Sequence, residues 1–197
     1  MYSQKDDEIV IIKYFNKCSK GRFLDIGANN GIVFSNTRRL VELGWSGVCV
    51  EPDPAAFVSL IENNKENSNI TLVNSGLGVV GGMQKFYAMQ DSLLSSFSPE
   101  QQKIWSKAPF VREFYVNQIT WEDLLKLVGS DFDFVNIDAE GISADLLEAM
   151  PFETISAKMI CVEHDGDITK VNKIFRQHKY REYHINDLNC LFVLESL

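Results

Sequence analysis

Short runs of apolar residues recur along the chain, and most of them have no alternating polar positions. Runs of this kind are typical of strands that are buried on both faces of a sheet. The pattern therefore predicts buried strands at Phe23–Ile26, Gly47–Val50, Ile70–Val73, Phe132–Ile137, Met159–Val162 and Leu191–Leu194.

Helical patterns lie between these runs. The first predicted helix follows Asp6 and ends before Gly21, and its apolar face and basic last turn are formed by Ile9, Ile12, Phe15, Lys17 and Lys20. A second is expected directly after Gly31, with Val33, Thr37, Leu40 and Val41 on one side and Gly44 at its C-cap.

Three further helices carry capping or stripe signals. Asp53 is suited to cap a helix with Pro54 in its first turn, and Ala56, Phe57, Leu60 and Ile61 form its apolar face. Thr120 and Asp123 resemble a capping box before Trp121–Val128. The last helix has a stripe formed by Val171, Ile174, Phe175 and His178.

Strands that alternate with helices indicate an α/β fold, with a doubly wound and mostly parallel sheet. The 197 residues suit one domain, 1–197, in which 1–21 is the leading helix. Residues 81–130 are too long for a simple connection, and we expect this insert to form a lid or acceptor region, with 91–114 closing over the acceptor. Its notable side chains are Ser92, Ser95, Ser96, Phe97, Ser98, Trp105, Phe110, Phe114 and Tyr115.

The charge and composition of the chain exclude some classes of binding partner. Nineteen Lys and Arg against 27 Asp and Glu give a net charge of -8, the wrong sign for a protein that binds nucleic acid. No apolar run approaches the roughly 20 residues that span a bilayer, so we expect a cytoplasmic protein without membrane insertion. The cysteines form no C-x-x-C pair and are expected to be reduced: Cys18, Cys49, Cys161 and Cys190.

The segment Asp25–Gly31 leaves the first predicted sheet strand, where doubly wound sheets bind nucleotides. Gly27 would allow a tight turn, Gly31 close packing, and a following helix N-terminus would offer free N–H groups to a ligand. The spacing D-x-G-x-x-x-G lacks the glycines of pyrophosphate binding and the Gly-Lys of a P-loop. A ligand with adenosine but no phosphates, such as S-adenosylmethionine, fits better than NAD or ATP.

Acidic residues follow the other strands. Glu51 ends the second strand, where an acid accepts hydrogen bonds from ribose hydroxyls. Asp138 and Glu140 follow the fourth strand, and Glu163 and His164 end the fifth, so carboxylates and one imidazole gather at the carboxyl edge of the sheet. These groups favour a positively charged sulfonium and could accept a proton or hold a divalent cation through oxygen ligands.

Of the three histidines, only His164 is expected at this edge. His178 lies on a helix stripe and His184 enters the last strand pair, so neither is given a role. The pKa range of histidine suits proton transfer near neutral pH, and we favour that function for His164 over structural capping of a loop.

Several blocks, in this order, resemble the FkbM-type family of S-adenosylmethionine-dependent methyltransferases over nearly the whole chain. The blocks are Tyr2–Gln4, Phe23–Gly31, Ser35–Thr37 with Leu40, Gly44–Pro52, Ile119–Leu125 and Asp133–Gly141. Where the family has a second Glu after Asp-x-Glu-Gly, this chain has Ile142 and Ser143, so any role of that acid is absent or displaced.

The resemblance implies a class I methyltransferase sheet with an antiparallel last strand, and O-methylation of hydroxyls on sugars and related metabolites. It implies that the cofactor lies at Asp25, Gly27, Asn29, Asn30, Gly31 and Glu51, with Asp138 near its methionine end and the acceptor. Because some relatives hold magnesium at this edge, Asp138, Glu163 and His164 are also kept as a candidate Mg²⁺ site.

The mechanism expected is in-line displacement at the sulfonium methyl by an acceptor oxygen, with the two reactants held in alignment. His164 or Asp138, with Glu140 beside them, would remove the acceptor proton. Two alternatives stay open: a nicotinamide-dinucleotide oxidoreductase on the same sheet, and a binding module that keeps S-adenosylmethionine but has no turnover. The acceptor is expected to be a small molecule or glycan, and the oligomeric state is open.

Overall fold

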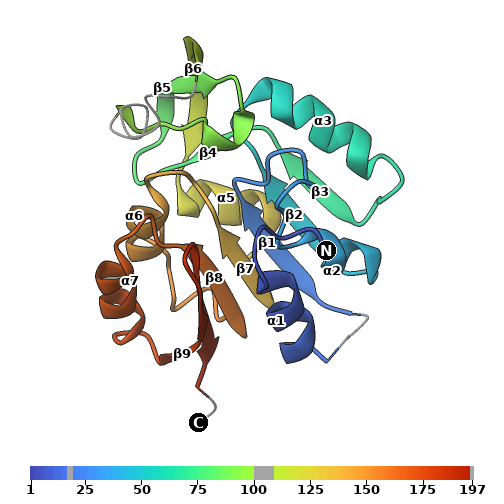
Figure 1. Cartoon of the computed structure of the whole chain (residues 1–197), viewed down its shortest axis with the longest axis vertical. Helices are drawn as coiled ribbons and strands as arrows, with labels where there is room; N and C mark the ends of the chain where they lie inside the picture. Colours follow the sequence, from blue (N-terminus) through green and yellow to red (C-terminus); the bar gives the residue numbers. More distant parts are fainter. Residues whose placement is uncertain (17–19, 100–108, 196–197) are drawn as a thin grey trace.

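The structure is a computed structural model of the chain that describes residues 1–16, 20–99 and 109–195. Its centre is a seven-stranded sheet in the order β3-β2-β1-β7-β8-β10-β9 (Figure 1). The strands of this sheet are β1 (Arg22–Ile26), β2 (Ser46–Val50), β3 (Ile70–Val73), β7 (Phe134–Ile137), β8 (Met159–Glu163), β9 (Tyr180–Ile185) and β10 (Asn189–Leu194).

Helices cover both faces of this sheet, as Figure 1 shows. They are α1 (Asp7–Tyr14), α2 (Arg38–Glu42), α3 (Pro54–Asn64), α5 (Trp121–Val128), α6 (Ser143–Glu148) and α7 (Ile168–Phe175). The predicted α/β class is therefore confirmed, and so are the six predicted strands, with shifts at some ends.

The register of the parallel strands aligns their carboxyl ends. Ile26 pairs with Val50 on one side and with Ile137 on the other, and Ile137 pairs in turn with Val162. The loops that follow these four residues therefore leave the sheet at one edge. Strand β10 runs antiparallel to both β8 and β9, which confirms the antiparallel last strand.

Successive residues of each central strand enter different cores, because side chains alternate between the faces of a sheet. In β1, Phe23 packs in the core under α1, α2 and α3, whereas Leu24 packs in the core under α5, α6 and α7. Both side chains are fully buried. Burial on both faces explains why the strands lack polar alternation.

The leading helix differs from its prediction. Helix α1 ends at Tyr14, so it does not continue to Lys20, and Lys17 lies outside the described residues. Ile9 is 59% exposed, while Ile11 is the fully buried apolar residue of the helix. Of the predicted face, Ile12 and Phe15 do pack against the core, and Ile9 does not, because the four consecutive apolar residues Ile9–Ile12 fit more than one helical stripe.

The second helix begins later than predicted. Helix α2 starts at Arg38, and Val33 is 46% exposed in the preceding loop. The side chain of Asn30 explains the delay, since its Oδ1 accepts the backbone N–H groups of Ile32 and Val33, both at 2.9 Å. A side chain that takes these N–H groups competes with a helical start.

The caps predicted for other helices are confirmed. Asp53 accepts the N–H of Ala55 at the start of α3, and Thr120 forms a capping box with Asp123 at the start of α5. Helix α7 ends at Phe175, so His178 lies beyond it, but the packing expected of its ring is present: it stacks on Phe152 with centroids 3.9 Å apart.

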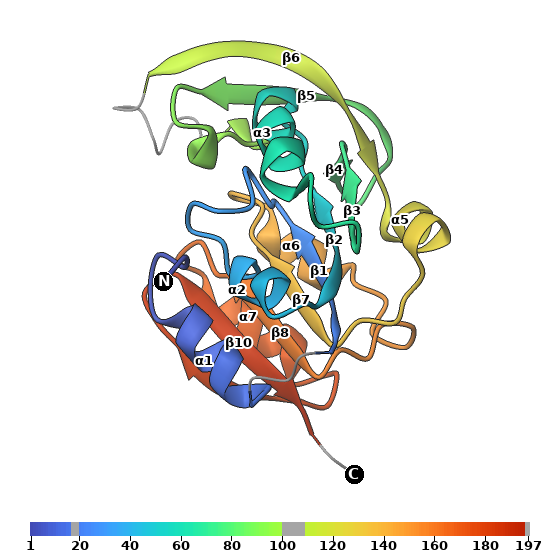
Figure 2. The same cartoon turned by 90° about the vertical axis from the view of Figure 1, so that its right-hand side faces the viewer.

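The insert 81–130 contains regular structure that the sequence pattern did not reveal. A second sheet has the order β4-β6-β5, formed by β4 (Gly76–Leu77), β5 (Gly82–Met89) and β6 (Phe110–Ile119). Figure 2 shows this small sheet above one end of the main sheet. A short 3₁₀ helix, η1 (Ser92–Leu94), follows β5, and Trp105 lies outside the described residues. The final part of the range, α5, belongs to the main core through Trp121 and Leu124.

Two other expectations concern the chain as a whole. Cys49, Cys161 and Cys190 are buried free thiols, as expected, while Cys18 lies outside the described residues. Among the described residues, the structure contains no helix with the length and apolar character needed to cross a membrane.

Candidate functional site

Glycine is required where the loop after β1 meets the end of β7. Gly27 has a φ of +82°, and a Cβ at this position would lie 1.7 Å from the carbonyl oxygen of Asp138. Gly31, with φ of +72°, would bring its Cβ within 2.6 Å of Leu60 on α3. Gly31 therefore serves close packing as predicted, and Gly27, whose positive φ fits the predicted tight turn, sets how near the first loop lies to Asp138.

The backbone N–H groups of this loop are already used within the chain. Gly27 and Ala28 donate to Val50 O, Asn29 to Glu51, Asn30 to the Asn29 side chain, and Gly31 to Ala28 O. Ile32 and Val33 donate to Asn30, as described above. The expected helix N-terminus with free N–H donors was therefore wrong, because α2 starts only at Arg38 and the N–H groups of the loop donate to acceptors within the chain.

Glu51, the residue after β2, closes the loop from the other side. Its Oε2 accepts the N–H of Asn29 and its Oε1 accepts the N–H of Asp53, both at 2.7 Å. Burial raises the pKa of Glu51 to about 7, against the lowering effect of these two hydrogen bonds. Each carboxylate oxygen keeps a second lone pair for a ligand hydroxyl.

Asp25 lies beneath the loop. Its two oxygens accept hydrogen bonds from Thr37 Oγ1 at 2.6 Å and from Asn136 Nδ2 at 2.8 Å. Burial raises the pKa of this carboxyl. Asp25, Asn30 and Gly31 do not line the cavity described next, and the ligand contacts that the resemblance implied for them stay a prediction.

A cavity of about 270 Å³ crosses the carboxyl edge of the main sheet. Its walls come from the loops after β1, β2, β7 and β8, from the segment 91–97 of the insert, and from the N-terminal segment. The lining residues used below are Gln4, Ile26, Gly27, Asn29, Phe34, Val50, Glu51, Pro52, Leu77, Phe86, Asp91, Ser92, Ser95, Ser96, Phe97, Asp138, Glu140, Glu163 and Leu188.

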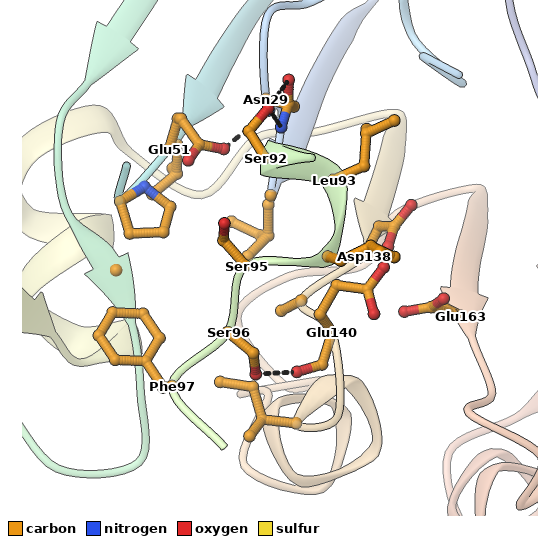
Figure 3. Close-up of a pocket in the computed structure, with 18 of the residues that line it drawn as sticks. Asn29, Glu51, Ser92, Leu93, Ser95, Ser96, Phe97, Asp138, Glu140 and Glu163 are labelled. Atoms are coloured by element: carbon orange, nitrogen blue, oxygen red, sulfur yellow. Dashed lines mark hydrogen bonds between the residues drawn. The ribbon is translucent and has the colours of Figure 1, made fainter. Parts of the chain in front are cut away.

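Three carboxylates gather at one end of this cavity. Asp138, Glu140 and Glu163 each place an oxygen within 4.8 Å of the others, and Figure 3 shows them side by side. Glu163 shares a hydrogen bond with Asp138, while its Oε2 is buried without a partner among the described residues. Burial and the neighbouring acids raise the pKa of Glu163 strongly, and burial raises the pKa of Asp138 to about 6. The pair therefore holds a shared proton, which we assign to Glu163 because its pKa is raised more.

His164 does not reach this cluster. Its Nδ1 accepts the N–H of Gly166 at 3.1 Å, so the neutral ring carries its proton on Nε2, which donates to the carbonyl of Asn186 at 3.2 Å. The ring does not line the cavity. The geometry thus places His164 as a cap between two loops and does not support the predicted roles as base or metal ligand.

The insert contributes to the cavity through one short segment. Ser92 exchanges a hydrogen bond with the amide of Asn29, and Ser96 donates to the carbonyl of Glu140 (Figure 3). Tyr115 is 64% exposed and does not line the cavity, and Phe114 packs on Phe86. Of the predicted insert residues, the structure thus brings Ser92, Ser95, Ser96 and Phe97 to the site.

Comparison with protein families identifies the family of the chain. The model of the methyltransferase FkbM domain matches residues 25–182. The chain belongs to this family. Membership excludes the nicotinamide oxidoreductase alternative and makes S-adenosylmethionine the cofactor of this FkbM-domain methyltransferase. Comparison with curated protein sequences finds no match.

Solved structures show that the fold of this FkbM-domain protein is shared by other methyltransferases. One is a precorrin-6y C5,15-methyltransferase from Geobacter metallireducens, with a TM-score of 0.54 and 14% identity over 100% of this chain and 94% of that one. Another is a TehB-like S-adenosylmethionine-dependent methyltransferase from Corynebacterium glutamicum, with a TM-score of 0.51 and 10% identity over 98% of this chain and 89% of that one. Identities this low show the fold alone.

The residues present fit the cofactor of the FkbM family. Glu51 offers carboxylate lone pairs at the end of β2, where ribose hydroxyls need acceptors. Apolar side chains that suit a purine ring line the cavity beside it, namely Val50, Pro52, Leu77, Phe86 and Phe97. Asp138 and its neighbours supply negative charge for a sulfonium.

Some lining residues were missed by sequence reasoning. Gln4 and Phe34 meet at the cavity because Ser3 forms a β-bridge with Phe34 across thirty residues of sequence. Leu188 arrives from the turn before β10. The block Tyr2–Gln4 in the family resemblance was the one available signal for Gln4, whereas Leu188 had none.

Proposed function

We propose that this methyltransferase transfers the methyl group of S-adenosylmethionine to a hydroxyl of a sugar, a glycan or a related metabolite. The observation that carries the proposal is the position of Asp138. It lines the same cavity as Glu51 and stands at the end where two other carboxylates gather.

A hydroxyl acceptor must lose a proton as its oxygen bonds to the methyl carbon. Asp138 is suited to receive that proton because Glu163 keeps its own and donates a hydrogen bond, which leaves Asp138 ionised inside a buried site. In the balanced step, the acceptor oxygen bonds to the methyl carbon, the carbon–sulfur bond breaks toward sulfur, and the proton passes to Asp138. S-adenosylhomocysteine and the methyl ether are the products.

Alignment supplies most of the acceleration in such a displacement, since little covalent work falls to the protein. Glu51 and the Gly27 turn would hold the adenosine part, while the acceptor would enter from the side of Glu140. The cofactor supplies an activated methyl group on a sulfonium.

The lining chemistry favours an acceptor rich in hydroxyls. Asp91 and Glu140 provide carboxylate acceptors, and Ser95 provides a hydroxyl at the wall of the insert. An acidic cavity in a chain of net charge -8 disfavours phosphate-rich acceptors such as nucleic acid.

The test is transfer of a tritiated methyl group from S-adenosylmethionine to a panel of glycans, free sugars and small hydroxylated metabolites. Incorporation into an alkali-stable ether supports the proposal. Binding of the cofactor with no transfer to any hydroxyl would favour a non-catalytic binding module instead, and transfer to nitrogen or carbon would contradict O-methylation.

A further inference from the structure

The acidic cavity would repel the amino-acid carboxylate of S-adenosylmethionine. Five acidic side chains line it, Glu51, Asp91, Asp138, Glu140 and the protonated Glu163, and the described lining contains no Lys, Arg or His. This charge suits the sulfonium and the amino group. The carboxylate of the amino-acid part is the one anionic group of the cofactor. Because the described lining has no cationic side chain, this carboxylate needs uncharged N–H or O–H donors.

The backbone cannot meet this need at the glycine loop. Each N–H from Gly27 to Val33 already donates to an acceptor within the chain. Beyond the loop, the N–H of Asp138 donates to Ile26 O and that of Ala139 to Ser143 Oγ. These loops therefore leave the side chains of the lining as candidates for the donor.

The described lining offers the hydroxyls of four serines and the side-chain amides of Gln4 and Asn29 as uncharged donors. The hydroxyls of Ser75, Ser92 and Ser96 donate within the chain, and Ser95 Oγ accepts the N–H of Met89. The amide of Asn29 is engaged with Ser92 at 3.1 Å. The amide of Gln4 has no hydrogen-bond partner among the described residues, and it offers two N–H donors without charge.

Contacts on both sides of Gln4 hold its backbone in place. On one side, Ser3 is buried, bridges Phe34, and accepts the N–H of Glu8 at 3.1 Å through Oγ. On the other side, the fully buried Asp7 accepts Nδ2 of Asn186 at 2.8 Å and Nδ2 of Asn189 at 3.0 Å. A residue between two such anchors reaches the cavity from a fixed position.

We propose that Gln4 binds the amino-acid carboxylate of S-adenosylmethionine through its side-chain amide, so that the N-terminal segment selects the complete cofactor over its truncated nucleoside. This inference rests on the cofactor identified above and is independent of the acceptor. Its discriminating prediction concerns two neutral-sulfur ligands that differ in the amino-acid part: S-adenosylhomocysteine has it, and 5′-methylthioadenosine lacks it.

The experiment measures the binding of both ligands to the wild-type chain and to Gln4→Ala by titration calorimetry. We expect the Kd of S-adenosylhomocysteine to rise about 10- to 100-fold, the range for a hydrogen bond to a charged group. The Kd of 5′-methylthioadenosine should be unchanged. Gln4→Glu, which places a carboxylate against a carboxylate, should lose more affinity for the first ligand and none for the second.

Gln177→Ala is the matched control, since Gln177 is exposed and does not line the cavity. Thermal unfolding of each unliganded variant verifies that the exposed Gln4 is not needed for folding. Unchanged binding of S-adenosylhomocysteine in Gln4→Ala, or an equal loss for both ligands, overturns the inference. A wild-type chain that binds neither ligand overturns the cofactor assignment itself, which separates the two failures.

Discussion

Glu51 Oε2 accepts the backbone N–H of Asn29 at 2.7 Å, which ties the acid after β2 to the loop after β1. The same carboxylate accepts the N–H of Asp53 and thereby also holds the start of α3. One side chain thus shapes the loop and presents its remaining lone pairs to the cavity, so its replacement has consequences for both stability and binding.

Replacing Glu51 by Gln tests its role in cofactor binding. A glutamine has one oxygen, so either Asn29 N–H or Asp53 N–H would face an NH₂ group. We expect the Kd of S-adenosylhomocysteine, measured by calorimetry, to rise about 10- to 100-fold. Glu62→Gln is the matched control because Glu62 is exposed on α3 and pairs with Lys65. Equal affinities of the wild-type chain, Glu51→Gln and Glu62→Gln for S-adenosylhomocysteine would show that Glu51 does not bind the cofactor.

The buried Glu51 also predicts a pH dependence of stability. Burial raises its pKa from 4.5 to about 7 in the folded chain, so the unfolded chain gives up this proton at lower pH than the folded chain does. The contribution of Glu51 to the free energy of unfolding is therefore highest below pH 4.5 and falls as pH rises toward 7, by up to about 3 kcal/mol.

Chemical denaturation at pH 5 and pH 7.5 measures this effect. The free energy of unfolding should fall more steeply between the two pH values in the wild-type chain than in Glu51→Gln. Parallel changes in the two proteins would show that Glu51 ionises at its ordinary pKa in the folded state.

Asp138→Asn tests the proton acceptor. Asparagine keeps the shape of the side chain and an oxygen for the Glu163 hydrogen bond, but it cannot take up a proton at neutral pH. We expect kcat for methyl transfer to fall about 100- to 10,000-fold, with a much smaller change in the Kd of S-adenosylhomocysteine. Asp145→Asn is the control, because Asp145 is exposed and pairs with Lys170. Retained kcat in Asp138→Asn would refute the assignment.

His164→Ala tests the capping role that the structure gives to this histidine. The ring is 9% exposed and hydrogen-bonds to two loops, so its loss should lower the free energy of unfolding by about 1–3 kcal/mol. The pH profile of kcat should keep its shape. If the pH profile of kcat lost one ionisation step in His164→Ala, His164 would be the general base instead.

Removal of metal distinguishes direct proton transfer from metal-assisted transfer. Asp138, Glu140 and Glu163 form an all-oxygen set of the kind that holds Mg²⁺. However, the Asp138–Glu163 hydrogen bond holds a proton between two of the three groups. We expect EDTA to leave methyl transfer unchanged. Loss of activity with recovery on adding Mg²⁺ would instead make these three residues the ligands.

The sequence predicted the sheet because its strands are buried on both faces. Phe134–Ile137 has no polar alternation apart from Asn136, whose amide is buried against Asp25. The insert escaped prediction because β6 is exposed along much of its length, so its residues follow neither a buried-strand nor a helical pattern. Helix α2 was placed too early because periodicity does not report a side chain such as Asn30 that captures the N–H groups first.

The candidate site was predictable where it depends on strand ends. Glu51 and Asp138 follow β2 and β7, and Glu163 is the last residue of β8, so the register of these strands brings all three to one edge. Two features depend on contacts distant in sequence and were not predictable from spacing. They are the capture of His164 by Asn186, and the approach of Gln4 through the Ser3–Phe34 bridge.

The most direct test of the account is a crystal structure of the chain with S-adenosylhomocysteine. We predict ribose hydroxyls bonded to Glu51, the purine against Pro52 and Leu77, and the sulfur directed toward Asp138. A ligand bound outside this cavity, or a ribose without contact to Glu51, would contradict the assignment of the site.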